Sequence, residues 1–152
     1  MLAAFALVNE PEPGIGGAPG GVEAVHLTLL KSDGSGKADA PKPKLMVGSP
    51  GALPIVIAPP NDLLALAISE GIEDALTAHQ ATGLGAWAAG AAGRMPGLAR
   101  LIPRYIESVT LYAHVGDRAG RDGVQGLAEA LDRRNRDDRD PLNIEILIEG
   151  LS

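Results

Sequence analysis

Residues 63–79 have the sequence LLALAISEGIEDALTAH, and this stretch decides the fold. Its first part is a nearly unbroken apolar run, which is typical of a strand covered on both faces. After Glu70 and Gly71, the residues Ile72, Ala75, Leu76 and His79 recur at helical spacing. The stretch therefore predicts a buried strand, a sharp turn and an amphipathic helix.

Glu70 lies at the carboxyl end of this predicted strand, where open α/β sheets carry their chemistry. An acid that closes a hydrophobic strand is costly unless it is paired or bound to a metal. Gly71 lets the backbone make the turn. Glu73 and Asp74 fall in the first helical turn, where the helix dipole favours negative charge. For these two acids, a purely structural role and a role in a site both stay open.

The composition limits the classes of protein. A chain of 152 residues suits one domain with a sizeable core, and its 3% aromatic content means a core of Ala, Val, Ile and Leu. The absence of cysteine excludes disulfides and thiolate zinc sites. A net charge of −6 argues against strong unaided binding to nucleic acid and suits a site that collects cations.

The amino-terminal run MLAAFAL is short and lacks the basic start of a signal peptide. No apolar run in the sequence is long enough to span a membrane. We therefore expect a cytoplasmic protein with no membrane partner.

Residues 1–62 predict a small antiparallel β unit. Strands are expected over residues 3–8 and 22–30, with a strong turn at residues 32–36 and a basic connection over residues 37–44. The glycine-rich residues 14–21 lie outside a strand-to-helix turn, and a proline interrupts them. A flexible loop is therefore expected there, and not a dinucleotide-binding turn.

Residues 63–152 alternate between strands and helices. The expected strands are residues 63–69, 83–89, 108–113 and 143–148, preceded by a short strand at 54–58, and the expected helices are residues 72–79, 96–102 and 120–133. This order predicts an α/β fold with a four-stranded, mostly parallel sheet and helices on both faces. The chain is therefore divided into residues 1–62 and residues 63–152.

A second candidate strand end lies in residues 109–120, VTLYAHVGDRAG, where a buried strand enters a polar, glycine-containing turn before a helix. It places Asp117 near a strand end, as Glu70 is. Carboxylates at neighbouring strand ends make a hard oxygen site suited to Mg²⁺.

These two stretches resemble the motifs of Toprim domains, which bacterial primases, topoisomerases and some nucleases share. Residues 70–74, EGIED, resemble the Glu-Gly-x-x-Asp motif, in which Gly71 and Asp74 are supporting positions. Residues 117–120, DRAG, resemble the end of the second motif, Asp-x-Asp-x-x-Gly, which closes at Gly120. The resemblance covers about residues 63–149, and residues 42–50 are similar to the segment before the Toprim core of primases. The likeness is closest to primase-like Toprim proteins of phages, plasmids and other mobile elements.

The chain departs from the family in the second motif, which has two aspartates where this sequence has one. Counting back from the glycine puts Asp117 at the second position and Val115, which cannot bind metal, at the first. Counting forward from the strand puts His114 at the first position, with one extra residue in the turn. An imidazole suits Mn²⁺ or Zn²⁺ better than Mg²⁺. A hydrogen-bonded histidine at a strand end is the other reading.

The resemblance implies a role in DNA replication through primase-like, metal-dependent nucleotidyl transfer. Glu70 would act as general acid or base, and Asp117 would hold Mg²⁺ or Mn²⁺ with Glu70 and His114. Two alternatives are a phosphodiester-cleaving nuclease that uses the same residues and a non-catalytic Toprim-fold binding module.

The implied partners are single-stranded DNA or nucleotides, together with a helicase or a zinc-module protein. Because the chain has no cysteine, a template-reading zinc module would come from elsewhere. Arg94, Arg118 and Arg121 are expected to form a local basic patch for nucleic acid near the strand ends. We expect little primer synthesis or nuclease activity from the protein alone.

Overall fold

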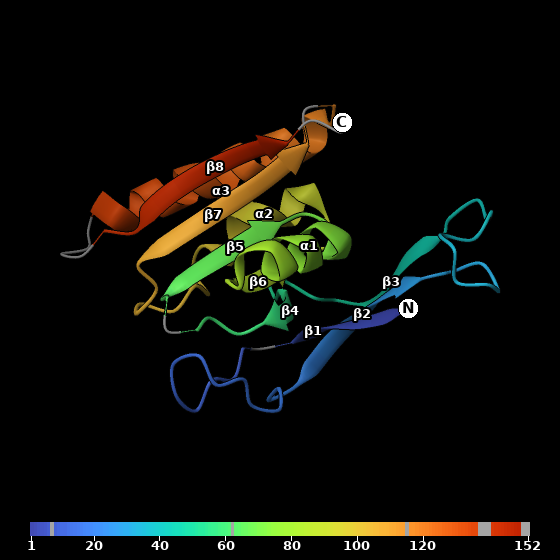
Figure 1. Cartoon of the computed structure of the whole chain (residues 1–152), viewed down its shortest axis with the longest axis horizontal. Helices are drawn as coiled ribbons and strands as arrows, with labels where there is room; N and C mark the ends of the chain where they lie inside the picture. Colours follow the sequence, from blue (N-terminus) through green and yellow to red (C-terminus); the bar gives the residue numbers. More distant parts are fainter. Residues whose placement is uncertain (7, 62, 115, 137–140, 150–152) are drawn as a thin grey trace.

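The structure is a computed structural model that describes residues 1–6, 8–61, 63–114, 116–136 and 141–149. It contains two sheets (Figure 1). The smaller sheet is antiparallel and three-stranded, with the order β1 (Leu2–Ala6), β2 (Val22–Thr28) and β3 (Lys44–Gly48). The small antiparallel β unit predicted at the start of the chain is confirmed.

The larger sheet has five strands in the order β4-β6-β5-β7-β8. Their bounds are Ile55–Ala58 for β4, Gly85–Ala88 for β6, Ala65–Ser69 for β5, Ser108–His114 for β7 and Asn143–Glu149 for β8. The last four strands in this order pair in parallel, and β4 pairs antiparallel with β6. The mostly parallel sheet predicted after residue 63 is confirmed, and β4 extends it with an edge strand from the preceding segment.

Helices cover both faces of the larger sheet, because β5 presents apolar side chains to both faces. Leu66 and Ile68 point to the face covered by α2 (Met95–Leu98) and α3 (Arg118–Arg136), where Trp87 is also buried. Ala67 points to the other face, which α1 (Ile72–Thr82) covers. The parallel strands are thus buried on both sides, as the unbroken apolar runs predicted.

Helix α1 is turned differently from its predicted orientation. Ile72, Ala75 and Ala78 are the buried residues of α1, and they pack against sheet alanines. Leu76 was expected on the packed side and is instead 43% exposed. The small side chains let the helix lie close to β4, β5 and β6, which leaves the larger Leu76 outside.

The other helices begin and end a few residues away from their predicted bounds. Residues 92–94 form a single 3₁₀ turn, η1 (Ala92–Arg94), and α2 ends at Leu98, well short of residue 102. Helix α3 is longer than predicted at both ends, because it begins at Arg118 and continues to Arg136.

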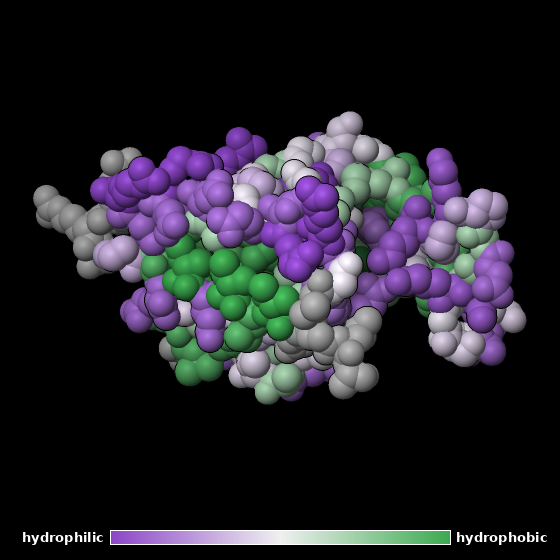
Figure 2. Space-filling model, turned by 90° about the horizontal axis from the view of Figure 1, so that it is seen from above, coloured by the Kyte–Doolittle hydropathy of each residue, from purple (hydrophilic) through white to green (hydrophobic). Residues whose placement is uncertain are grey.

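No helix in the described part of the chain is long and apolar enough to cross a membrane. The view from above, onto the β8 side of the molecule, shows an apolar area bordered by hydrophilic side chains (Figure 2). The exposed large hydrophobic side chains of β8 are Ile146 and Ile148. This edge of the larger sheet is therefore partly apolar.

Candidate functional site

Glu70 immediately follows β5 and begins the turn into α1. The turn is fastened to the end of β6, because the Gly90 N–H donates to the Glu70 carbonyl at 2.9 Å. Gly71 has an ordinary extended backbone, with φ −92° and ψ 150°. A Cβ there would lie only 2.9 Å from Asp74 Oδ2. The glycine leaves room for the Asp74 carboxylate beside the turn, and the turn itself does not use a positive φ.

Asp117 lies just before α3. Its carboxylate and that of Glu70 both lie next to the Cα of Gly120. A Cβ built on Gly120 would lie 2.7 Å from Asp117 Oδ2 and 3.3 Å from Glu70 Oε2. The two carboxylate oxygens therefore lie no more than 6.0 Å apart. The missing side chain of Gly120 makes room for both.

The two carboxylates line a cleft of about 280 Å³. Its lining residues come from both sheets and from the starts of α1 and α3: Lys37, Lys44, Glu70, Gly71, Glu73, Asp74, Tyr112, Ala113, His114, Asp117 and Gly120. The cleft therefore gathers acids, two lysines and a histidine at the carboxyl ends of β5 and β7.

The cleft raises the pKa of the Glu70 carboxyl above its ordinary value. Burial is the largest cause, and the negative charge of Asp117 adds to it, with a smaller contribution from Asp74. A hydrogen bond from the Ala92 backbone and the positive charge of Lys44 act in the opposite direction. A proton or a cation between Glu70 and Asp117 would relieve this repulsion.

The donor set fits a hard divalent cation that keeps part of its hydration shell. Within the residues that the structure describes, no group of three or more His, Cys, Asp or Glu side chains is placed to hold a metal ion. Mg²⁺ is commonly held by one or two carboxylates, with water and substrate phosphate oxygens completing the octahedron. Glu70 and Asp117 supply such a pair.

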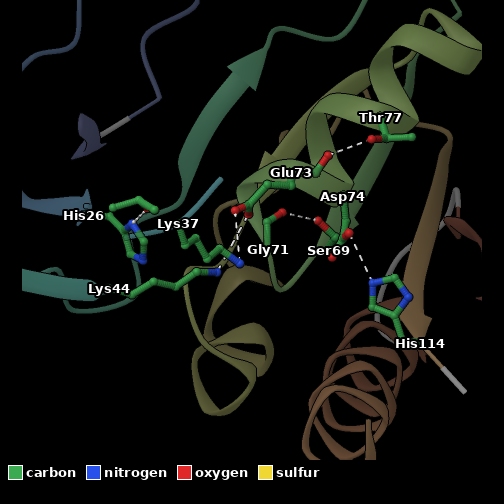
Figure 3. Close-up of polar contacts among 10 residues, drawn as sticks. His26, Lys37, Lys44, Ser69, Gly71, Glu73, Asp74, Thr77 and His114 are labelled. Atoms are coloured by element: carbon green, nitrogen blue, oxygen red, sulfur yellow. Dashed lines mark hydrogen bonds and ion pairs between the residues drawn. The ribbon is translucent and has the colours of Figure 1, made fainter. Parts of the chain in front are cut away.

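His114 is the hydrogen-bonded partner of Asp74. Its Nε2 lies 3.1 Å from Asp74 Oδ1 (Figure 3), while its Nδ1 is buried without a hydrogen-bond partner among the described residues. Of the two readings of His114, the contact favours the hydrogen-bonded histidine at a strand end, since Asp74 occupies its accessible nitrogen. Val115, the other candidate for the first motif position, lies outside the described residues.

The cleft is bordered by Lys37, from the connection between β2 and β3, and by Lys44, the first residue of β3. The sequence interpretation did not include them in the site. Their Nζ atoms lie 3.5 and 3.8 Å from the carboxylate of Glu73 (Figure 3). Burial acts to raise the pKa of Glu73, but a backbone hydrogen bond and the two lysines outweigh it and lower that pKa. The basic connection at residues 37–44 was the available signal, since all four lysines of the chain lie in residues 31–44.

Arg94 has a structural role in place of the predicted nucleic-acid contact. Its guanidinium donates to the carbonyls of Ala89, Gly51 and Leu53 at 2.8, 2.9 and 2.6 Å. It also stacks over the Phe5 ring, 4.6 Å from the centroid. These contacts join the loop after β6 to β1 and to the segment before β4, so this side chain is not available as a phosphate ligand.

Arg118 and Arg121 are exposed on the first turns of α3, next to the cleft. Arg118 is 90% exposed and pairs with Asp122 at 3.8 Å. Their position is compatible with the predicted patch for nucleic acid, which is now reduced to these two arginines.

Comparisons with known proteins give little beyond the geometry. No family model matches the chain, and no curated protein matches it. Among solved structures, the chain is similar to a DNA primase domain from Pseudomonas aeruginosa, with a TM-score of 0.47 and 16% sequence identity. The match covers 95% of this chain and 49% of that domain, so the chain spans about half its length. The functional conclusion therefore rests on the residues of the cleft.

Proposed function

We propose that this chain is a Toprim-like domain of DNA replication that performs primase-like nucleotidyl transfer with a divalent metal and depends on a partner for full activity. The observation that carries the proposal is the convergence of Glu70 and Asp117 above Gly120, in a cleft that Lys37 and Lys44 border. The assignment to Toprim proteins rests on the resemblance of residues 70–74 and 117–120 to the Toprim motifs, and the assignment to primases among them rests on the resemblance of residues 42–50 to the segment before the Toprim core of primases.

Each side chain has a distinct role in this proposal. Glu70 exchanges a proton with the attacking or leaving oxygen, and its raised pKa brings it closer to the range useful for proton transfer at neutral pH. Asp117 and Glu70 hold Mg²⁺ or Mn²⁺, which when bound supplies neutralisation of phosphate charge and orientation of the reacting groups. Asp74 fixes the ring of His114 at the cleft wall.

The lysines provide positive charge at the border of the acidic cleft. Lys37 and Lys44 pair with Glu73 at the cleft border, where an arriving phosphate competes with that carboxylate for two ammonium groups. The substrate would thus be selected by its phosphates, whether they belong to a nucleotide or to single-stranded DNA. Phosphodiester cleavage uses the same groups and is the related alternative.

A second function, a non-catalytic binding module, is favoured by one observation. The described residues do not supply the third acidic ligand that the second Toprim motif provides. A cleft with two carboxylates would still bind a cation and phosphates without catalysing transfer.

Incorporation of labelled nucleotide on single-stranded DNA, with Mg²⁺ and then Mn²⁺, tests the proposal. We expect weak synthesis by the protein alone, stimulation by a helicase or zinc-module protein, and loss of synthesis in Glu70→Gln. The matched control is Glu12→Gln, which removes an exposed charge that is far from Glu70 in the sequence.

The outcomes separate the two functions. Synthesis that persists in Glu70→Gln would show that the activity comes from another site or a contaminant. No synthesis with either metal or with partners, together with metal binding that requires Asp117, would establish the binding module.

A further inference from the structure

The antiparallel sheet of β1, β2 and β3 has an inner face and an outer face. On the inner face, Phe5 and Ala24 are buried in one cluster with Ile55 and Ala67 of the larger sheet. Because side chains alternate along a strand, the residues next to Phe5 and Ala24 point to the opposite, outer face. Cross-strand pairing aligns the outer residues in two rows: Leu2, Leu27 and Leu45 in one, and Ala4, Val25 and Val47 in the other.

Both rows of the outer face are apolar and open to solvent. Leu2, Leu45 and Val47 are 65%, 39% and 54% exposed, and Val25 and Leu27 of the central strand are only partly buried. An antiparallel sheet with one solvated face normally carries polar side chains on that face. A continuous apolar face of this kind is typical of an interaction surface.

The two ends of the small sheet differ in charge. Residues 8–28 carry three glutamates and no lysine or arginine, and Glu12 and Glu23 are exposed. Residues 29–44 carry four lysines and two aspartates; two of these lysines border the cleft, and Lys42 is exposed. The connections before and after β2 lie at opposite ends of the sheet (Figure 1). One end is therefore acidic and the other basic.

We propose that the outer face binds a second copy of this chain, with the two small sheets packed face to face. A two-fold axis that lies between the sheets and crosses the strands makes β2 of one copy antiparallel to β2 of its partner. The acidic end of each sheet then faces the basic end of the other. The rows pack as in an aligned sandwich, with the sheets about 10 Å apart, and no charged side chain of either row is buried.

The charge pattern selects a second copy and this orientation, because an axis parallel to the strands would bring like ends together. The interface is small. Strands of 5, 7 and 5 residues cover less than the about 800 Å² per partner of a standard interface. We therefore expect a weak dimer, with a dissociation constant on the order of 0.1 mM.

The outer face is separate from the proposed catalytic cleft. Neither row contains a residue that lines the cleft among the described residues, because β3 directs Lys44 to the cleft and the next residue, Leu45, to the outer face. The inference therefore does not depend on the nucleotidyl-transfer proposal, and each can fail without the other.

Sedimentation velocity of the whole chain, from about 10 µM to about 1 mM, tests the proposal. We expect a monomer–dimer equilibrium that is weakened by about tenfold or more in Leu45→Lys, because this variant places an unpaired charge inside the interface. Leu76→Lys is the matched control, since Leu76 is a leucine of α1 with similar exposure, 43% against 39%. It should associate as the wild type does.

Two measurements on the wild type locate the interface and its orientation. Rising concentration should shift the backbone amide signals of Val25, Leu27 and Val47 in NMR spectra. Carbodiimide crosslinking of mixed isotope-labelled and unlabelled chains should join Glu12 or Glu23 of one chain to a lysine of the other.

Several results would overturn the inference. A monomer at every concentration would do so and would leave the apolar face to a different protein. Unchanged association in Leu45→Lys, or concentration-dependent shifts at Ile146 and Ile148 of β8 in place of the small sheet, would assign the dimer to another surface. Crosslinks within one chain only, in a solution that contains dimer, would exclude the antiparallel arrangement. The wild-type shifts decide the matter even if Leu45→Lys folds poorly.

Discussion

Glu70 and Glu10 are two half-buried glutamates whose surroundings differ. Burial raises the pKa of both. Around Glu70, the charges of Asp117 and Asp74 raise its pKa further, and Lys44 opposes them. Around Glu10, no neighbouring charge contributes to the shift.

The difference shows how one physical penalty can select two kinds of ligand. A pair of carboxylates in a polar cleft favours a small divalent cation with its own water and phosphate ligands. A single carboxylate whose oxygens are shielded from solvent favours a proton, because protonation removes the cost of a buried, unpaired charge. Four predictions test this contrast, from the largest expected effect to the smallest.

Arg94→Met should have the largest effect, because Arg94 joins several segments of the chain. Its contacts join the loop after β6 to Phe5 of β1 and to the segment before β4. Loss of three charged hydrogen bonds should lower the free energy of unfolding by about 3 kcal/mol. Urea unfolding measures the change, and Arg100→Met, an exposed arginine, is the control. Equal stability of the two variants would show that the connection is dispensable.

Asp117→Asn should weaken Mg²⁺ and Mn²⁺ binding by about tenfold or more, because it removes a charged ligand of the proposed metal. Asp122→Asn removes an exposed charge from the helix that follows Asp117, α3, and should have little effect. Isothermal calorimetry gives both affinities. If Asp117→Asn retains the wild-type affinity for the metal, Asp117 is not a ligand.

The pH dependence of stability should separate the two glutamates. Each has a folded-state pKa raised above its ordinary value of 4.5, so the folded protein binds the proton more tightly than the unfolded chain. The wild type should therefore lose stability as pH rises from 4.5 through the raised pKa. Glu70→Gln and Glu10→Gln should be more stable than the wild type above that range and lose the advantage below it.

Melting temperatures followed by circular dichroism across pH, with and without Mg²⁺, measure this effect. Mg²⁺ should reduce the advantage of Glu70→Gln at neutral pH and leave that of Glu10→Gln unchanged. An equal response of the two variants to Mg²⁺ would contradict the contrast between the sites.

Arg118→Gln should have the smallest effect. Its side chain is 90% exposed and lies at the border of the cleft, where solvent and salt screen its charge. Binding of single-stranded DNA should weaken by about twofold, with a slightly shallower salt dependence. Fluorescence anisotropy at two salt concentrations measures both. If Arg118→Gln lowers the affinity for single-stranded DNA as much as Lys44→Gln does, then α3 contributes to the nucleic-acid contact as strongly as the lysines.

Much of the larger sheet could be predicted from local patterns. The apolar runs gave the parallel strands, and the change to helical spacing after Glu70 gave α1, because buried strands and amphipathic helices repeat at different intervals. Parallel strands end at the same edge of a sheet, so the sequence also brought Glu70 and Asp117 to one side. Leu76 was wrongly expected on the packed side of α1, because periodicity does not show how closely a helix with small side chains can pack against a sheet.

The sequence by itself determined the order of elements, the strand-end position of Glu70 and the acidic character of the site. Only the tertiary structure decided that Lys37 and Lys44 reach Glu73, that Arg94 joins two segments, and that the Glu10 carboxylate is shielded from solvent. The contacts of the two lysines and of Arg94 with other segments link residues from 29 to 89 positions apart, across two sheets, and no local repeat specifies such separations. The sequence specifies which side chains are charged, but the packing of the two sheets determines which charged groups lie next to each other.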